Sequence, residues 1–116
     1  MLGALWAALG VTLGAFGAHA LREGLAERHH VETWETAVFY HLVHALALIA
    51  YGQYIDRARG RDLPALLFFL GSALFSGSLY VLSFDVLKAV MGPITPLGGA
   101  LSIAGWVLFA LEARRR

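Results

Sequence analysis

Charged residues are confined to a few short segments of this sequence, and long uncharged stretches lie between them. Each uncharged stretch is close to the roughly 20 apolar residues that an α-helix needs to cross a bilayer core. A helix satisfies its own backbone hydrogen bonds, so lipid accepts it where it would not accept a loop. The pattern therefore predicts an all-α integral membrane bundle of four transmembrane helices, in one domain over residues 1–116. The predicted helices span about residues 2–21, 36–55, 63–84 and 95–111.

The composition agrees with a membrane protein. Hydrophobic residues make up 59% of the chain and charged residues 15%, whereas soluble domains average about 25% charged residues. The net charge of +1 and the lack of a basic face argue against a nucleic-acid partner. The chain has no Cys, which excludes disulfides, thiolate metal sites and Cys nucleophiles.

The distribution of Lys and Arg predicts the orientation through the positive-inside rule. The segment between the second and third predicted helices and the C-terminal tail carry six of these residues, and the other two connections carry three. We therefore expect a multi-pass membrane protein with an N-in/C-in topology. The residues counted are Arg57, Arg59, Arg61, Arg114, Arg115 and Arg116 on the inner side, and Arg22, Arg28 and Lys88 on the outer side.

The first predicted helix has a second interpretation. Ala18-His19-Ala20 has the small-x-small form of a signal-peptidase site, so this helix could be a cleaved signal peptide. Its apolar run is longer than that of a signal peptide, and no basic region precedes the run, which favours a transmembrane helix. The apolar connection over residues 86–95 is expected to lie as a loop in the outer interface.

Small residues mark the helix faces that are expected to pack closely. Gly10, Gly14 and Ala18 recur every four residues, a spacing that lets two helix backbones approach each other. The favoured interpretation is packing within the four helices, and dimerisation is the alternative. The further candidates for helix packing are Gly17, Gly77, Gly98 and Gly99.

Ionisable side chains at membrane depth are costly, so each one is a functional hypothesis. His19, His41 and His44 all fall within about 12 Å of the outer boundary at 1.5 Å per residue. Ser76, Ser78, Ser102 and Thr12 come out at a similar level, whereas the inner half has no ionisable side chain. A continuous hydrophilic path, as a channel would need, is therefore not visible in a single chain.

The histidines allow several interpretations. His41 and His44 share one helix face and could bind a metal or haem, with His19 or Glu35 as a further metal ligand. Neutral imidazoles that hydrogen-bond across helices are the simpler interpretation and the favoured one. No nucleophile, base and acid can be assembled, so no catalytic residue, cofactor or metal is predicted.

Four blocks of sequence, taken together, resemble the YgdD/YwdK family of small bacterial inner-membrane proteins of unknown function. The resemblance implies the membrane fold but no activity, substrate or cofactor. It supports His19 and His44 more than His41, because the family pattern has Tyr-Gln-x-x-His where this chain has Tyr40-His41 and then His44. The blocks are LGAFGAH at residues 13–19, FYHLVHALAL at 39–48, LFSGSLY at 74–80 and ITPLGG at 94–99.

These observations lead to the hypothesis of a non-enzymatic binding or accessory protein with an outward-facing polar pocket for a lipid, a small molecule or a partner. Membrane lipid is the expected partner, and a homo-oligomer or another membrane protein is also considered. The alternatives are a small oligomeric transporter or channel, or a membrane protein with a His-ligated metal or haem. The candidate pocket residues are His19, Tyr40, His41, His44, Ser76, Ser78 and Thr95.

Overall fold

The computed structural model describes residues 1–58 and 62–115, and these residues fold into five α-helices with loops between them. Of the residues counted for the orientation, Arg59, Arg61 and Arg116 lie outside the described residues. The helices are α1 (Leu2–Ala18), α2 (Arg22–Glu27), α3 (Val31–Ala58), α4 (Leu63–Leu82) and α5 (Lys88–Arg114).

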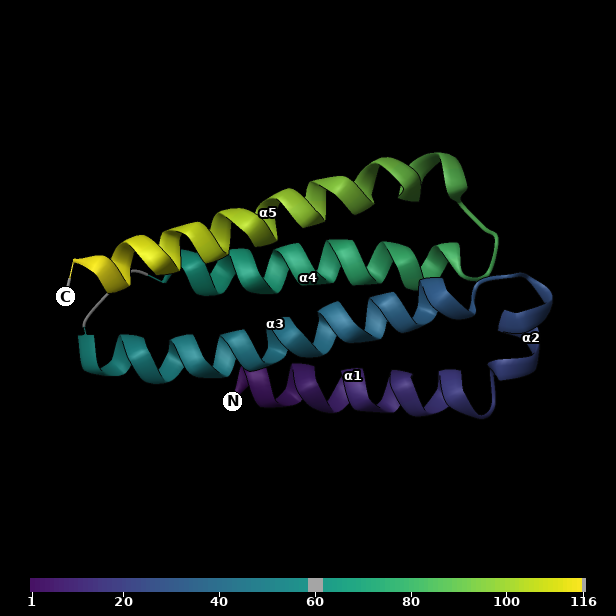
Figure 1. Cartoon of the computed structure of the whole chain (residues 1–116), viewed down its shortest axis with the longest axis horizontal. Coiled ribbons are helices and arrows are strands. Elements are labelled where there is room, and N and C mark those ends of the chain that lie inside the picture. Colours follow the sequence, from purple (N-terminus) through teal and green to yellow (C-terminus); the bar gives the residue numbers. More distant parts are fainter. Residues whose placement is uncertain (59–61, 116) are drawn as a thin grey trace.

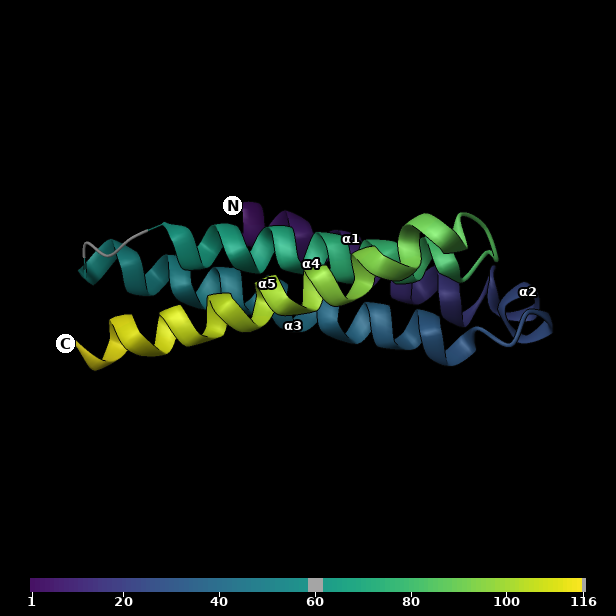
Figure 2. The ribbon, with the colours of Figure 1, turned by 90° about the horizontal axis from the view of Figure 1, so that it is seen from above.

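The four long helices lie in a row, in the order α1, α3, α4, α5 (Figure 1). The short α2 lies across one end of the row, beside the connection between α4 and α5, and the C-terminus lies at the opposite end (Figure 1). The view in Figure 2 shows the same helices running side by side along the long axis of the molecule. Both broad faces of the row are therefore available to the surrounding solvent, which for apolar helices is lipid.

Three of the described helices are long and apolar enough to cross a membrane, namely α3 over Val31–Ile55, α4 and α5. This agrees with the predicted membrane bundle. The fourth helix, α1, is apolar but has 17 residues, or about 25 Å. Its Gly3 lies against Ala45 and Ile49 of α3, so α1 begins well short of the end of α3 at Ala58.

The helix bounds differ from the predicted ones at the end of the row where α2 lies. There α3 begins at Val31 instead of residue 36, and α1 and α4 end before residues 21 and 84. Residues 86–95, predicted as a loop, are helical from Lys88 onwards, and α5 continues through Pro93 and Pro96. Each Pro removes one backbone donor from the helix, which membrane helices tolerate when neighbouring groups satisfy the freed carbonyl.

Glycine lets the backbones of α4 and α5 come into contact, and it makes room on α1 for side chains of α3. A Cβ atom on Gly98 of α5 would lie 2.3 Å from the backbone nitrogen of Phe75 in α4, and one on Gly71 would lie 2.6 Å from the backbone nitrogen of Ser102. On α1, a Cβ on Gly10 would lie 2.8 Å from Leu42, and Gly17 faces the Trp34 ring. These positions leave no room for a side chain.

The other small residues proposed for packing have more space. A Cβ on Gly14 would meet Val38 at 3.2 Å, and one on Gly99 would meet Phe75 at an ordinary 3.6 Å. A Cβ on Gly77 would meet nothing within 4 Å, and Ala18 is exposed. Gly77 and Ala18 therefore do not mark a close helix contact within the described part of the chain.

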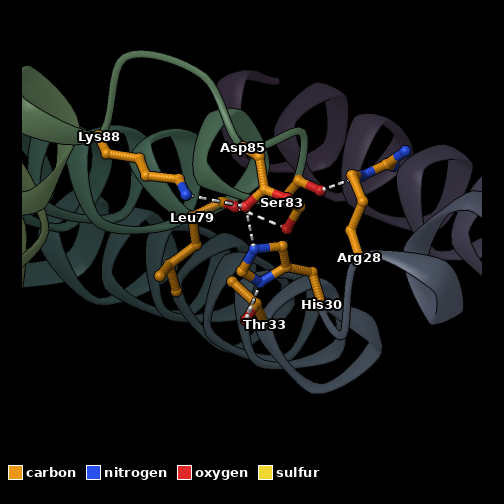
Figure 3. A network of polar contacts seen from close by, with 7 residues as sticks. All are labelled: Arg28, His30, Thr33, Leu79, Ser83, Asp85 and Lys88. Carbon is orange, nitrogen blue, oxygen red and sulfur yellow. Dashed lines mark hydrogen bonds and ion pairs between the residues drawn. The ribbon is translucent and has the colours of Figure 1, made fainter.

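Charged and polar side chains join the two loops at the α2 end of the row. The His30 ring hydrogen-bonds the Asp85 carboxylate at 2.7 Å, and Lys88 lies 3.4 Å from the same oxygen (Figure 3). Arg28 donates to the Ser83 carbonyl at 2.8 Å and stacks over the Phe84 ring. The hydrogen bond from His30, together with the Lys88 charge, holds the pKa of Asp85 below its ordinary value.

We expect Gly98→Ala to lower the free energy of unfolding by about 2 kcal/mol or more, because the added methyl overlaps the backbone of α4 and forces α5 away from it. The unfolding midpoint of the detergent-solubilised protein, measured by circular dichroism, gives the result. Gly99→Ala is the matched control, since its methyl would have ordinary contacts. Equal stability of the two variants would contradict the close contact between α4 and α5.

Candidate functional site

His41 lies in the centre of the described helices and has both ring nitrogens paired. Its Nε2 donates to the Trp6 carbonyl of α1 at 2.8 Å, and its Nδ1 hydrogen-bonds the Tyr80 hydroxyl of α4 at 2.9 Å. The side chain is fully buried, and the Trp6 ring stacks against it at 4.1 Å. These two hydrogen bonds connect α1, α3 and α4 through one buried side chain.

His44 is paired in the same way, one turn further along α3. The Trp106 indole of α5 donates to its Nε2 at 3.1 Å, and its Nδ1 donates to the Tyr40 carbonyl at 2.7 Å. The ring is 4% exposed. His44 is therefore neutral, and it ties α5 to α3.

The serine and threonine side chains of the predicted pocket also have hydrogen-bond partners already. Ser76 donates to the Ala37 carbonyl at 2.7 Å and so connects α4 to α3. Ser78 hydrogen-bonds Thr95 of α5, and its hydroxyl also contacts the Phe75 carbonyl. These hydroxyls satisfy each other and the backbone, as polar groups in lipid must.

His19 is apart from this group. It is the residue that ends α1, its side chain is exposed, and it has no side-chain hydrogen bond within the described residues. The described contacts of His41, His44 and the pocket hydroxyls do not include it. Of the predicted pocket residues, the structure brings together Tyr40 with His44 and Ser78 with Thr95, whereas His41 and Ser76 bond to other residues. His19 lies apart from them, at the loop between α1 and α2.

A cavity of about 320 Å³ lies between α3, α4 and α5. Two of the predicted residues, Tyr40 and His44, contribute to its wall. Three side chains of the wall are partly open to the surroundings, namely Tyr40, Ile103 and Trp106. The cavity therefore opens sideways, between α3 and α5, and not toward the ends of the helices. The lining residues are Tyr40, His44, Ser72, Phe75, Gly99, Ser102, Ile103 and Trp106.

Ser102 is the unusual member of this wall. Within the described residues it carries the buried side-chain polar atom that has no hydrogen-bond partner. The residue is 7% exposed, and its hydroxyl lies beside Gly71 of α4. A buried hydroxyl without a partner costs about 1–3 kcal/mol. The hydroxyl of Ser102 faces Gly71 of α4, so its side chain would have to rotate to contact an occupant of the cavity.

The sequence analysis named Ser102 as a polar residue of the fourth predicted helix but did not select it for the pocket, and it missed Ser72, Ile103 and Trp106. Ser72 is already bonded, since it accepts from the Trp6 indole at 3.0 Å and donates to the Phe69 carbonyl. The available signal was the spacing of Gly99, Ser102 and Trp106, which puts small and polar residues on neighbouring positions of one helix.

The described residues hold no group of three His, Cys, Asp or Glu side chains that could bind a metal. A metal or haem on His41 or His44 would also have to break one of the two hydrogen bonds that each ring makes. The arrangement thus offers no support for the metal, haem or redox alternative, and no observation on the described helices favours a channel.

If His41 is a structural residue, its replacement should act on stability alone. We expect His41→Leu to lower the free energy of unfolding by about 1–2 kcal/mol, because the Tyr80 hydroxyl and the Trp6 carbonyl lose a buried partner. Tyr80→Phe should lower the free energy of unfolding by less than His41→Leu does. The double variant should lower it by less than the sum of the two single effects. Additive effects, or a metal that copurifies and is lost with His41, would contradict this role.

Comparison with known proteins places the chain in a family. Residues 13–99 match the family described as "Protein of unknown function (DUF423)". The membrane protein YwdK of Bacillus subtilis is 42% identical over 97% of this chain and 93% of its own length. SH2409 of Staphylococcus haemolyticus is 40% identical over 97% of this chain and 91% of its own length.

A relative is also found outside bacteria. C1782.12c of Schizosaccharomyces pombe, which like the other two is named a UPF0382 membrane protein, is 36% identical over 89% of this chain and 90% of its own length. No solved structure matches the chain. These matches confirm the resemblance to YwdK that the four sequence blocks carry. The chain thus belongs to the DUF423 family of membrane proteins, whose function is unknown.

Proposed function

We propose that this protein is a non-enzymatic membrane protein that binds a molecule from the lipid phase in the cavity between α3, α4 and α5. The unpaired hydroxyl of Ser102 in the cavity wall carries this proposal. The neighbouring hydroxyls are paired, so among the described residues the hydroxyl of Ser102 is the one left to bond with a group of the ligand, once its side chain rotates from Gly71 toward the cavity.

The cavity is reached from the bilayer. Its rim consists of Tyr40, Ile103 and Trp106, which lie on the parts of α3 and α5 that are apolar enough to be in lipid. Ser72 in its wall lies about 14 Å along α4 from Leu63, which is near the middle of a hydrocarbon core of roughly 30 Å. A ligand would therefore enter from between lipid tails.

The chemistry of the wall limits the ligand. The cavity volume of about 320 Å³ is at the lower end of the usual range for small-molecule sites. Phe75, Ile103 and Trp106 provide apolar and aromatic contacts, whereas the nitrogens of His44 are already paired. The best match is an aliphatic chain or compact ring that carries one group able to hydrogen-bond with Ser102.

For the membrane arrangement we propose that α1 is the fourth crossing and that both termini lie in the cytoplasm. The six basic residues at the proposed inner end support this orientation. The bacterial relatives are named membrane proteins, and for a bacterial chain with apolar helices the cytoplasmic membrane is the expected location. The short length of α1 is compatible with local thinning of the bilayer beside it.

The orientation can be tested by labelling, because the chain has no Cys. We expect Ala26→Cys, in α2, to react with a membrane-impermeant maleimide in intact cells. Ala113→Cys, near the end of α5, should react only after permeabilisation. Both positions are exposed, so access to the thiol depends on the side of the membrane. The opposite labelling pattern would reverse the orientation, and equal labelling of both in intact cells would exclude a single fixed one.

The binding proposal predicts opposite effects of one substitution on stability and on binding. Ser102→Ala should raise the free energy of unfolding of the empty protein by about 1 kcal/mol, because it removes an unpaired buried hydroxyl. A long-chain primary alcohol should raise the unfolding midpoint of the unchanged protein more than the alkane of the same length does. In Ser102→Ala this difference between alcohol and alkane should disappear.

Ser76→Ala is the matched control, because Ser76 is bonded to the Ala37 carbonyl and is not part of the cavity wall. It should lower stability and leave the difference between alcohol and alkane unchanged. The proposal fails if alcohol and alkane raise the unfolding midpoint of the unchanged protein equally. It also fails if Ser76→Ala and Ser102→Ala reduce the difference between alcohol and alkane by the same amount.

A further inference from the structure

A second hollow lies on the other side of α3, between α1, α2 and the first turns of α3. Its volume is about 360 Å³, and it is separate from the cavity that contains Ser102. Apolar side chains and glycine line most of it, among them Val38, Phe39 and Leu42. Arg22 and Glu35 lie at the α2 end, so the hollow runs from a charged pair to an apolar part of the helices.

The walls of this hollow are held in place. The Trp34 indole donates to the Leu13 carbonyl at 2.8 Å, and Gly17 leaves the space that the indole fills. Leu25 of α2 is 1% exposed and covers one end. The two helices are thus locked together beside the hollow, which exists without a ligand and does not have to open.

The ion pair between Arg22 and Glu35 leaves part of each charged group without a partner among the described residues. Arg22 Nη1 lies 3.2 Å from Glu35 Oε1, and both side chains are more than half exposed. Among the described residues, neither side chain has another hydrogen bond. The guanidinium therefore keeps donors for an anionic group, and the carboxylate keeps an oxygen for a cationic one.

We propose that this hollow binds a zwitterionic, amine-bearing phospholipid of the phosphatidylethanolamine type. The phosphate pairs with Arg22, the ammonium pairs with Glu35, and one acyl chain lies in the apolar part beside Val38 and Leu42. Glu32, which is one turn before Glu35, adds negative charge beside the ammonium. This inference is independent of the ligand proposed for the Ser102 cavity.

The position of the charged pair favours a membrane lipid over a soluble molecule. Glu35 directly precedes the uncharged stretch that begins at residue 36, so the pair is at the level where headgroups meet hydrocarbon. The acidic excess over residues 22–35, with four Glu and two Arg, disfavours a lipid whose headgroup has a net negative charge. A zwitterion satisfies both charges without leaving either one unpaired.

The experiment is native mass spectrometry of the full chain released from nanodiscs that contain equal amounts of phosphatidylethanolamine and phosphatidylglycerol. We expect the unchanged protein to retain phosphatidylethanolamine in preference. Glu35→Gln should lower the ratio of retained phosphatidylethanolamine to phosphatidylglycerol by at least about threefold, because only the ammonium needs the carboxylate. Arg22→Gln should lower the retention of both lipids, since both contain the phosphate.

Lys88→Gln is the matched control, because Lys88 also forms an exposed ion pair at this end but is not part of the hollow. It should leave the lipid ratio unchanged. Water-soluble glycerophosphoethanolamine, which has the headgroup without acyl chains, should not displace the bound lipid. The proposal is overturned if the unchanged protein retains both lipids equally, if Lys88→Gln alters the ratio as Glu35→Gln does, or if the soluble headgroup competes.

Discussion

Lipid tails offer neither hydrogen-bond donors nor acceptors, so the polar groups of the helices must bond to one another. His41 meets this constraint by bonding to α1 and α4 at once, and His44 by bonding to α5. Each imidazole therefore acts as a connector, and the hydroxyl of Ser76 has the same role. Polar residues that would otherwise look like a binding site thus serve to hold a row of helices together.

Glycine complements these hydrogen bonds. Where Gly98 faces the backbone of Phe75, α4 and α5 touch without intervening side chains, and the hydrogen bond between Ser78 and Thr95 joins the same two helices nearby. Toward the α3 side of the same helices, larger side chains separate the backbones, and the cavity forms there. Ser102 lies at the boundary between these regions, close to Gly71 yet without a partner. In the described part of the chain, the hydroxyl of Ser102 is thus unpaired although the backbones of α4 and α5 are in close contact beside it.

The sequence predicted the features that depend on hydropathy and charge, namely the long apolar helices. It failed at Val31 and Lys88, where α3 and α5 begin earlier than predicted, because these first turns hold charged residues and Pro and so do not resemble a membrane span. It could not predict which polar groups are free. That depends on contacts such as Trp106 with His44, which join residues far apart in the chain.

The row arrangement explains how the Ser102 cavity and the hollow beside α1 can lie on different sides of α3. In a closed bundle the central helix faces point at each other, whereas here α3 has α1 on one side and α4 on the other, and its remaining surface faces lipid. Tyr40 and Phe39 are neighbours in the chain and contribute to different hollows. A ligand in the Ser102 cavity would fill space between α3 and α5, which meet there through the long side chains of Trp106 and His44. The packing of α5 against α3 would then depend on what the bilayer supplies, while the glycine contact would still hold α5 to α4.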